Sequence, residues 1–328
     1  MDTFLNELGF PGLLILLCGS LWLLMKGADW LIDGSTNLAR RIGVSELVIG
    51  LTVVAFGTSL PELVVSVQAA LIGKGSLSFA NVIGSNIANI GLVLGFTAII
   101  HPLTASAPVR QKDTPFAVLI VFAFLATLLS QQTSAGDEWI FPRWGGGLLL
   151  FLFGIFILRL IFFGKEEDQD DEPHDLTMTV AALLIIGGSA LLGLGGFYTV
   201  EAASRIAMNL GISEHVVGLT VVAFGTSLPE LVACIVGARK KMVKLVLGNI
   251  LGSNLMNLTL VLGSASAIRE ISIDKFGVID SIAMVAITCS MAFFLMRKKV
   301  PHLSRTVGFG WMGFWIMYMA YTGVRSLG

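Results

Sequence analysis

One stretch of fifteen residues occurs twice in this chain. Residues 50–64 and residues 218–232 both read GLTVVAFGTSLPELV, at an offset of 168 residues. The match continues without a gap, because GSNIAN at 84–89 aligns with GSNLMN at 252–257 at the same offset. Self-similarity at a fixed spacing predicts that two copies of one structural unit build the fold.

The composition places both copies in a membrane. Hydrophobic residues make up 55% of the chain and charged residues 13%, about half of the ~25% charged fraction of soluble domains. Apolar stretches reach the ~20 residues that a helix needs to cross a bilayer core. We therefore expect an all-α integral membrane protein and exclude a soluble enzyme, a disordered chain and a disulfide scaffold. The formal net charge of −1 gives no basis for nucleic-acid binding.

Apolar windows predict ten transmembrane helices. They cover residues 10–36, 44–73, 77–100, 115–131, 144–163, 177–209, 212–238, 244–268, 277–296 and 306–325. Five of them fall in a first repeat, residues 1–164, and five in a second repeat, residues 177–328. Because five is odd, the second repeat enters the membrane from the opposite side. Two inverted repeats of this kind are typical of secondary transporters.

A hydrophilic segment, residues 165–176, separates the repeats and begins KEEDQDDEPHD. Runs of like charge usually stay solvated, so we interpret it as an acidic linker, with a regulatory cation-binding loop as the alternative. Lys and Arg residues gather in the loops on the linker's side of the membrane. The positive-inside rule then predicts a cytoplasmic linker and both termini outside. The acidic residues Asp2 and Glu7 argue against a cleaved signal peptide.

The repeated GTSLPE motif combines a helix break with oxygen ligands. Pro61 has no N–H and crowds the carbonyl of Gly57, so the helix must loosen there and free carbonyls of residues 55–57. Both copies place hydroxyls and a carboxylate at the same level, and oxygen ligands suit hard cations such as Ca²⁺ or Na⁺. These side chains are Thr58, Ser59 and Glu62 in the first copy and Thr226, Ser227 and Glu230 in the second.

The two glutamates are the strongest candidates for ion binding. Glu62 and Glu230 fall about midway along their predicted spans, where a carboxylate costs ~2.5–3.5 kcal/mol on insertion scales. One Ca²⁺, two Na⁺ or two protons would neutralise the pair. A kink with a paired acid is the alternative for either copy alone, but the duplication of the polar residues favours ion coordination.

The GSN motifs offer further oxygen ligands. Ser85 and Asn89 lie one turn apart on one helix face, and so do Ser253 and Asn257. Their side-chain oxygens can complete a shell of six to eight oxygens, although such motifs also serve helix packing. The asparagines at positions 86 and 254 fall on other faces, where we expect interhelical hydrogen bonds.

At these residues the chain resembles the calcium/cation antiporter family, and within it the prokaryotic sodium/calcium exchangers. The resemblance implies that Glu62 and Glu230 are the central ion-binding glutamates, and that the long helices 10–36 and 177–209 slide across the ion-binding core. It also implies that hydroxyl, amide and carbonyl ligands come from Ala55, Thr58, Ser59, Ser85, Asn89, Ala223, Thr226, Ser227, Ser253 and Asn257.

The expected function is secondary-active antiport of Na⁺ for Ca²⁺, by alternating access around a midplane site. Many sodium/calcium exchangers have an aspartate where this chain has Asn257, so an H⁺-coupled or K⁺-dependent exchanger is the alternative and a passive cation channel a further one. We expect a transporter rather than an enzyme, without a resident cofactor, that binds Ca²⁺ and Na⁺ as transported ions. Its expected location is the plasma (inner) membrane; no oligomeric state is predicted.

Overall fold

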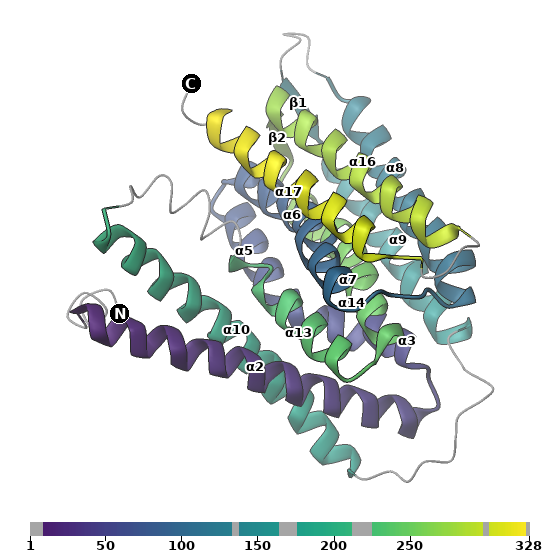
Figure 1. Ribbon diagram of the computed structural model, residues 1–328. Helices are drawn as coiled ribbons and strands as arrows, with labels where there is room; N and C mark the ends of the chain where they lie inside the picture. The colour runs from purple at the N-terminus through teal and green to yellow at the C-terminus, as the bar shows by residue number, and fades with distance from the viewer. Residues whose placement is uncertain (1–8, 133–137, 164–175, 212–224, 298–301, 326–328) are drawn as a thin grey trace.

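The computed structural model describes residues 9–132, 138–163, 176–211, 225–297 and 302–325, and almost all of them are helical (Figure 1). Within these ranges, three π-helical segments interrupt the first half of the chain and one the second half, each continuous with an α-helix. The first-half elements are α2 (Gly9–Ile42), α3 (Glu46–Ile49), η1 (Gly50–Val54), α4 (Ala55–Thr58), α5 (Leu60–Leu71), α6 (Gly75–Ala88), η2 (Asn89–Leu94), α7 (Gly95–Ile100), η3 (Val109–Asp113), α8 (Thr114–Leu129), β1 (Glu138–Phe141) and α9 (Arg143–Phe163). The second-half elements are α10 (Met178–Asn209), α13 (Leu228–Arg239), α14 (Val243–Met256), η5 (Asn257–Leu262), α15 (Gly263–Ile268), β2 (Ile271–Asp274), α16 (Lys275–Met296) and α17 (Arg305–Arg325).

The protein is a helical integral membrane protein. Seven helices among the described residues are long and apolar enough to cross a membrane, and a bent pair, Glu46–Thr58 with Leu60–Leu71, makes an eighth candidate. The helix ends follow the predicted ones closely, except that α2 continues to Ile42. Residues 212–224, in the predicted seventh helix, lie outside the described part of the chain, as do residues 164–175 of the acidic linker.

The two longest helices, α2 and α10, pack against each other along one side of the molecule (Figure 1). They run antiparallel, because Gly34 lies against Ala181 while Gly188 lies against Leu31. A Cβ atom on Gly188 would be 2.5 Å from the backbone nitrogen of Leu31. Glycine therefore lets the two backbones approach closely, as small residues do in membrane helix pairs.

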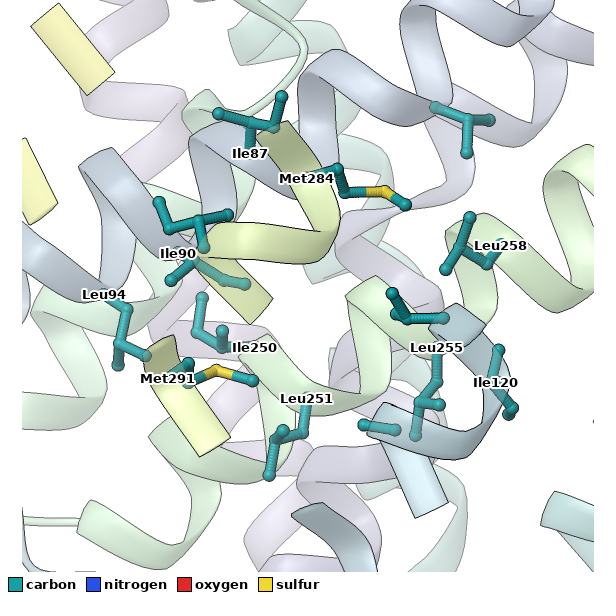
Figure 2. Packing of buried hydrophobic residues seen from close by; sticks show 14 of the residues in the cluster. Ile87, Ile90, Leu94, Ile120, Ile250, Leu251, Leu255, Leu258, Met284 and Met291 are labelled. Carbon is teal, nitrogen blue, oxygen red and sulfur yellow. The ribbon is translucent and has the colours of Figure 1, made fainter. Parts of the chain in front are cut away.

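The remaining helices form a bundle around two nearly enclosed spans. The span Val243–Ile268 is 94% buried and the span Gly75–Ile100 is 78% buried. Figure 2 shows Ile87 and Ile90 of the second span beside Met284 of α16, with Ile250 of the first span below them. The core that holds the repeated motifs is thus shielded from lipid by the outer helices.

A short antiparallel ribbon, absent from the all-α prediction, joins the halves at one end of the bundle. Strand β1 pairs with β2 from Glu138 opposite Asp274 to Phe141 opposite Ile271. In β2 the isoleucines at 271 and 273 are buried, whereas Ser272 and Asp274 are exposed. This alternation directs both isoleucine side chains into the core. The sequence did not reveal the strand, because it has only four residues and lies between long apolar windows.

Ion pairs connect helix ends that are distant in the sequence. Lys240, directly after α13, lies 2.7 Å from Asp33 Oδ1 and 3.2 Å from Asp29 Oδ1, both on α2. Arg325 makes two hydrogen bonds to Asp280 across α16 and α17, at 3.0 and 3.1 Å. A partly buried pair between Arg159 and Asp113 joins α9 to η3 in the same way. These contacts fix which helix ends lie together.

The α2–α10 contact predicts the effect of a single methyl group. Gly188→Ala should destabilise the protein by about 1–3 kcal/mol, because its Cβ meets backbone atoms that cannot move aside. Gly193→Ala on the same helix is the matched control, since a Cβ there has no heavy atom within 4 Å. Thermal unfolding of the purified protein in detergent measures both, and equal midpoints for the two variants would contradict the close approach.

Candidate ion-binding site

The repeated motif breaks its helix at the predicted place. Helix α4 ends at Thr58, α5 begins at Leu60, and the two are bent by 53°. Ser59 between them has φ −89° and ψ 8°, and its counterpart Ser227 has φ −88° and ψ 2°. In both copies proline occupies the first turn of the following helix, where its missing N–H costs no helical hydrogen bond. The two copies therefore share one local conformation.

Each break leads directly to a buried glutamate. Glu62 and Glu230 lie in the first turns of α5 and α13, and both are 0% exposed. Among the described residues, neither carboxylate oxygen of Glu62 has a hydrogen-bond partner at normal distance, although the Ser85 hydroxyl is near enough to interact with it, and Glu230 Oε2 has no partner. The two carboxylates are close enough to repel each other electrostatically. The helix N-termini offset part of that repulsion, and the unpaired oxygens leave room for a cation.

Hydroxyl groups at the two helix breaks contact residues of the other copy of the repeat. Ser59 Oγ donates to Glu230 Oε1 at 2.9 Å, and it lies 3.0 Å from Ser253 Oγ. In the other direction, Thr226 Oγ1 lies 3.5 Å from Ser85 Oγ. The two repeated motifs therefore meet, and each half supplies one side of a single polar centre.

Two predicted ligands mark the points where the core helices become π-helical. Asn89 begins η2 and Asn257 begins η5, and both are fully buried. Neither the oxygen nor the nitrogen of the Asn257 amide has a partner in the described structure. Asn89 donates to Asn254 Oδ1 at 3.1 Å, a hydrogen bond between core helices of the kind expected for position 254. Short π segments occur frequently at functional sites, but the apolar pattern did not reveal these.

The carbonyl of Ala55 keeps a helical partner, contrary to the expectation that the break would free it. Ala55 O accepts from the backbone N–H of Ser59 at 3.0 Å and lies 3.3 Å from Thr58 Oγ1. The last turn before the bend thus remains closed, because Ser59 still supplies an N–H. A carbonyl oxygen has a second lone pair and can still bind a cation. Ala223, its predicted counterpart, lies outside the described residues.

The donor set consists of two carboxylates and neutral oxygens. No group of three or more His, Cys, Asp or Glu side chains suited to a metal occurs in the described part of the chain. Around Glu62 and Glu230 the available oxygens belong to hydroxyl, amide and carbonyl groups, which hard cations prefer. The structure brings the following predicted residues into this polar centre by direct contact: Thr58, Ser59, Ser85, Thr226, Glu230 and Ser253.

Sequence reasoning gave no role to one residue that contacts this centre. Asn249 is buried on α14, where it accepts from Thr58 Oγ1 at 3.3 Å and donates to Cys234 Sγ at 3.5 Å. Its counterpart Asn81 donates to Ser66 Oγ at 3.0 Å. The signal was present, because both asparagines match in the repeat and lie one turn before a predicted serine ligand.

A family model described as "Sodium/calcium exchanger protein" matches residues 12–162 and 180–324. The chain belongs to this family. It is 33% identical over 316 residues to "Putative antiporter CaxA" of Alkalimonas amylolytica, covering 93% of this chain and 95% of the relative. It is 30% identical to "Sodium/calcium exchanger MaX1" of Methanosarcina acetivorans, covering 86% and 90%. The match confirms the resemblance of the motifs to the exchanger family.

Solved structures agree with this assignment. The exchanger superimposes on the sodium-calcium exchanger NCX_Mj, soaked with 2.5 mM Na⁺ and 10 mM Sr²⁺, with a TM-score of 0.81 at 32% identity. The match covers 95% of this chain and 99% of the other. The protein is accordingly a membrane antiporter of the sodium/calcium exchanger family, and its helices follow the arrangement of a solved family member.

The unpaired carboxylates predict that a cation stabilises the exchanger. Ca²⁺ at one hundred times its dissociation constant should add about 2.7 kcal/mol to the free energy of unfolding, if it binds only the folded state. The thermal unfolding midpoint of purified protein, titrated with CaCl₂, measures this. Glu62→Gln should abolish the shift, whereas Glu138→Gln at the exposed start of β1 should retain it. An equal shift in Glu62→Gln would place the bound cation elsewhere.

Proposed function

We propose that this exchanger is a secondary-active antiporter that exchanges Na⁺ for Ca²⁺ by alternating access around one midplane site, built by Glu62 and Glu230. The observation that carries this proposal is the state of Glu62, fully buried with both carboxylate oxygens unpartnered among the described residues. Unpaired charge at such depth is expensive. A bound cation removes that cost, which makes ion binding the natural role of the residue.

Neutralisation of the two glutamate charges couples the transport of Na⁺ to the transport of Ca²⁺. One Ca²⁺ or two Na⁺ neutralise the two glutamates, so the two ion species compete for the same carboxylates. An empty site leaves two like charges facing each other in a closed cavity, which opposes movement between the two access states. Loaded forms cross and the empty form does not, and this produces exchange rather than leak. The same logic counts against a passive cation channel.

The contacts between helix ends support the predicted topology. We infer ten spans in two inverted repeats, residues 1–164 and 177–328, joined by the acidic linker at 165–176. This topology puts Asp33 and Lys240 on the linker side, and they form an ion pair. It puts β1 and β2, which pair, on the side of the termini. The antiparallel packing of α2 and α10 is also what inversion of the first helix of each repeat requires.

The long helices are suited to be the moving elements. A cavity of about 1060 Å³, lined almost entirely by apolar side chains, separates part of α10 from α4, α5 and α9. Phe56 and Pro61 of the broken helix lie on one side of it and Ile185 of α10 on the other. Ser189 of α10 packs closely against Gly57 of α4 at this cavity, whereas the apolar space beside that contact leaves α10 room to shift along the core while it keeps its close contact with α2.

The coupling ion is the finer part of the proposal. Asn257 is neutral, so the site has two carboxylates, and Na⁺ coupling follows from competition for this pair. An H⁺-coupled or K⁺-dependent cation exchanger is the alternative, because Asn257, whose amide has no partner among the described residues, stands where many sodium/calcium exchangers have an aspartate. We place the protein in the plasma (inner) membrane, which the similarity to "Inner membrane protein YrbG" of Escherichia coli supports, at 31% identity over 316 residues.

Flux measurements test the function directly. Proteoliposomes loaded with Na⁺ and diluted into ⁴⁵Ca²⁺ should take up Ca²⁺ only while the Na⁺ gradient lasts. Glu62→Gln and Glu230→Gln should each reduce uptake by about 100-fold or more, since each removes a charge that the ion requires. Glu138→Gln is the control and should transport normally. Uptake driven equally well by a pH gradient without Na⁺ would favour proton coupling, and uptake without any counter-ion would indicate a channel.

A third carboxylate should change ion preference. Asn257→Asp adds a negative charge at a buried position beside the proposed site, so the apparent affinity for Ca²⁺ should rise by about tenfold or more. The number of Na⁺ needed to displace Ca²⁺ should rise too, measured as a steeper dependence of Ca²⁺ release on Na⁺ concentration. Asn86→Asp is the control, because the Asn86 amide is buried on α6 and donates to Met284 Sδ of α16. Unchanged ion dependence in Asn257→Asp would remove this residue from the site.

A further inference from the structure

A buried asparagine contacts the polar centre from outside the proposed ligand set. Asn249, 1% exposed, lies on α14 one turn before Ser253. Thr58 donates its hydroxyl hydrogen bond to Asn249 Oδ1 at 3.3 Å. The amide nitrogen of Asn249 donates to Cys234 Sγ on α13 at 3.5 Å. A chain of two hydrogen bonds thus runs from the broken helix through α14 to α13.

The direction of the Thr58 proton matters for cation binding. A hydroxyl group binds a cation through its oxygen lone pairs, so its single proton must point away from the ion toward another acceptor. Among the described residues, three acceptors lie within 3.4 Å of Thr58 Oγ1, namely Ala55 O at 3.3 Å, Asn249 Oδ1 at 3.3 Å and Ser253 Oγ at 3.4 Å. The Thr58 hydroxyl also interacts with the Glu230 carboxylate, which is itself a proposed ligand. Only one of them can take the proton at a time.

Two of these acceptors compete with the ion. The Ala55 carbonyl and the Ser253 hydroxyl are themselves proposed ligands, and Ser253 Oγ also lies 3.0 Å from Ser59 Oγ, whose proton goes to Glu230 Oε1. A proton aimed at either oxygen would point into the ion-binding space and repel the cation. Asn249 Oδ1 is the remaining acceptor, and it lies outside the ligand set.

We propose that Asn249 is a positioning residue for cation binding, which accepts the Thr58 proton and thereby turns the Thr58 oxygen toward the ion. Cys234 Sγ accepts a hydrogen bond from the Asn249 amide nitrogen, and this orients the amide so that its oxygen faces Thr58. This inference rests on the proposed ion site and adds to it a residue that touches no ion. A misplaced proton would weaken binding without disturbing the movement of the helices.

The second copy provides a matched control within the chain. Asn81 occupies the corresponding position on α6, and its nitrogen donates to Ser66 Oγ at 3.0 Å. The hydroxyl of Thr226 lies 3.5 Å from Ser85 Oγ, and in the described residues it makes no hydrogen bond to Asn81. In this conformation the hydrogen-bond chain from Thr58 through Asn249 to Cys234, which we call the relay, is therefore formed in one copy. Substitution of Asn249 should accordingly affect Ca²⁺ binding more than substitution of Asn81.

The test is the Ca²⁺ concentration dependence of Na⁺-driven uptake in proteoliposomes. Asn249→Leu, branched at Cγ like asparagine but without an acceptor, should raise the KM for Ca²⁺ about tenfold and change the maximal rate less than twofold. Asn81→Leu should raise KM less than threefold. Cys234→Ser keeps an acceptor for the amide, as Ser66 does, and should resemble the wild type, whereas Cys234→Ala should raise KM about threefold.

A double-mutant cycle separates positioning from general structural damage. Once Thr58→Val has removed the hydroxyl, adding Asn249→Leu should have little further effect on KM, because the two residues act through one bond. Additive effects, a loss of maximal rate at constant KM, or an equal effect of Asn81→Leu would overturn the inference. Where Asn249→Leu does not give monodisperse protein, Cys234→Ala decides, and a wild-type KM in that variant would overturn it.

The same assay distinguishes this inference from the proposed function. Exchange that survives Glu62→Gln at its normal rate refutes the ion site and the relay together. Exchange abolished by Glu62→Gln, with a wild-type KM in monodisperse Asn249→Leu, refutes the relay alone.

Discussion

The structure depends on two carboxylates held inside a membrane protein, and no Lys, Arg or His of the described ranges forms an ion pair with either of them. Glu62 and Glu230 are completely buried and feel each other's charge. In an environment of low polarity, such charges must be neutralised by a bound ion or a proton. The surrounding hydroxyls and amides cannot remove the charge, although they can orient and share an ion. The break in each helix, the burial of the core and the close packing around it all serve this arrangement.

The helix breaks and the core helices depend on each other. A bend within a membrane span leaves backbone groups that lipid cannot satisfy, so a broken helix is tolerated only where protein or a polar cavity surrounds it. The most buried span, Val243–Ile268, provides that surrounding for Ser59 through Ser253. Exchange of partners between the copies means that neither half can form the polar centre alone. Such interlocking explains why the repeated residues include the polar ones.

The packing around α10 is asymmetric. Helices α2 and α10 touch each other backbone to backbone through glycine, while α10 borders an apolar cavity on its other side. A helix that packs closely on one neighbour, as α10 does on α2, and borders open space on its other side can move together with that neighbour. The ion pair from Lys240 to Asp29 and Asp33 ties α2 to the end of α13 on one side. An ion pair between exposed side chains is weak enough to break and re-form during such a movement.

Much of this protein was readable from the sequence, because its signals are local. Apolar length gave the helices, proline gave the bend at Ser59, and exact repetition identified Glu62, Glu230 and the GSN motifs as one recurring set. Tertiary structure alone decided which groups meet. No local pattern encodes the pairing of β1 with β2, the link from Lys240 to α2 or the contact of Asn249 with Thr58, because each joins segments that are distant in the sequence. The π segments at Asn89 and Asn257 are shifts of helical register, which no local pattern encodes either. Periodicity constrains the face a side chain occupies, whereas its partner is set by the packing of the whole bundle.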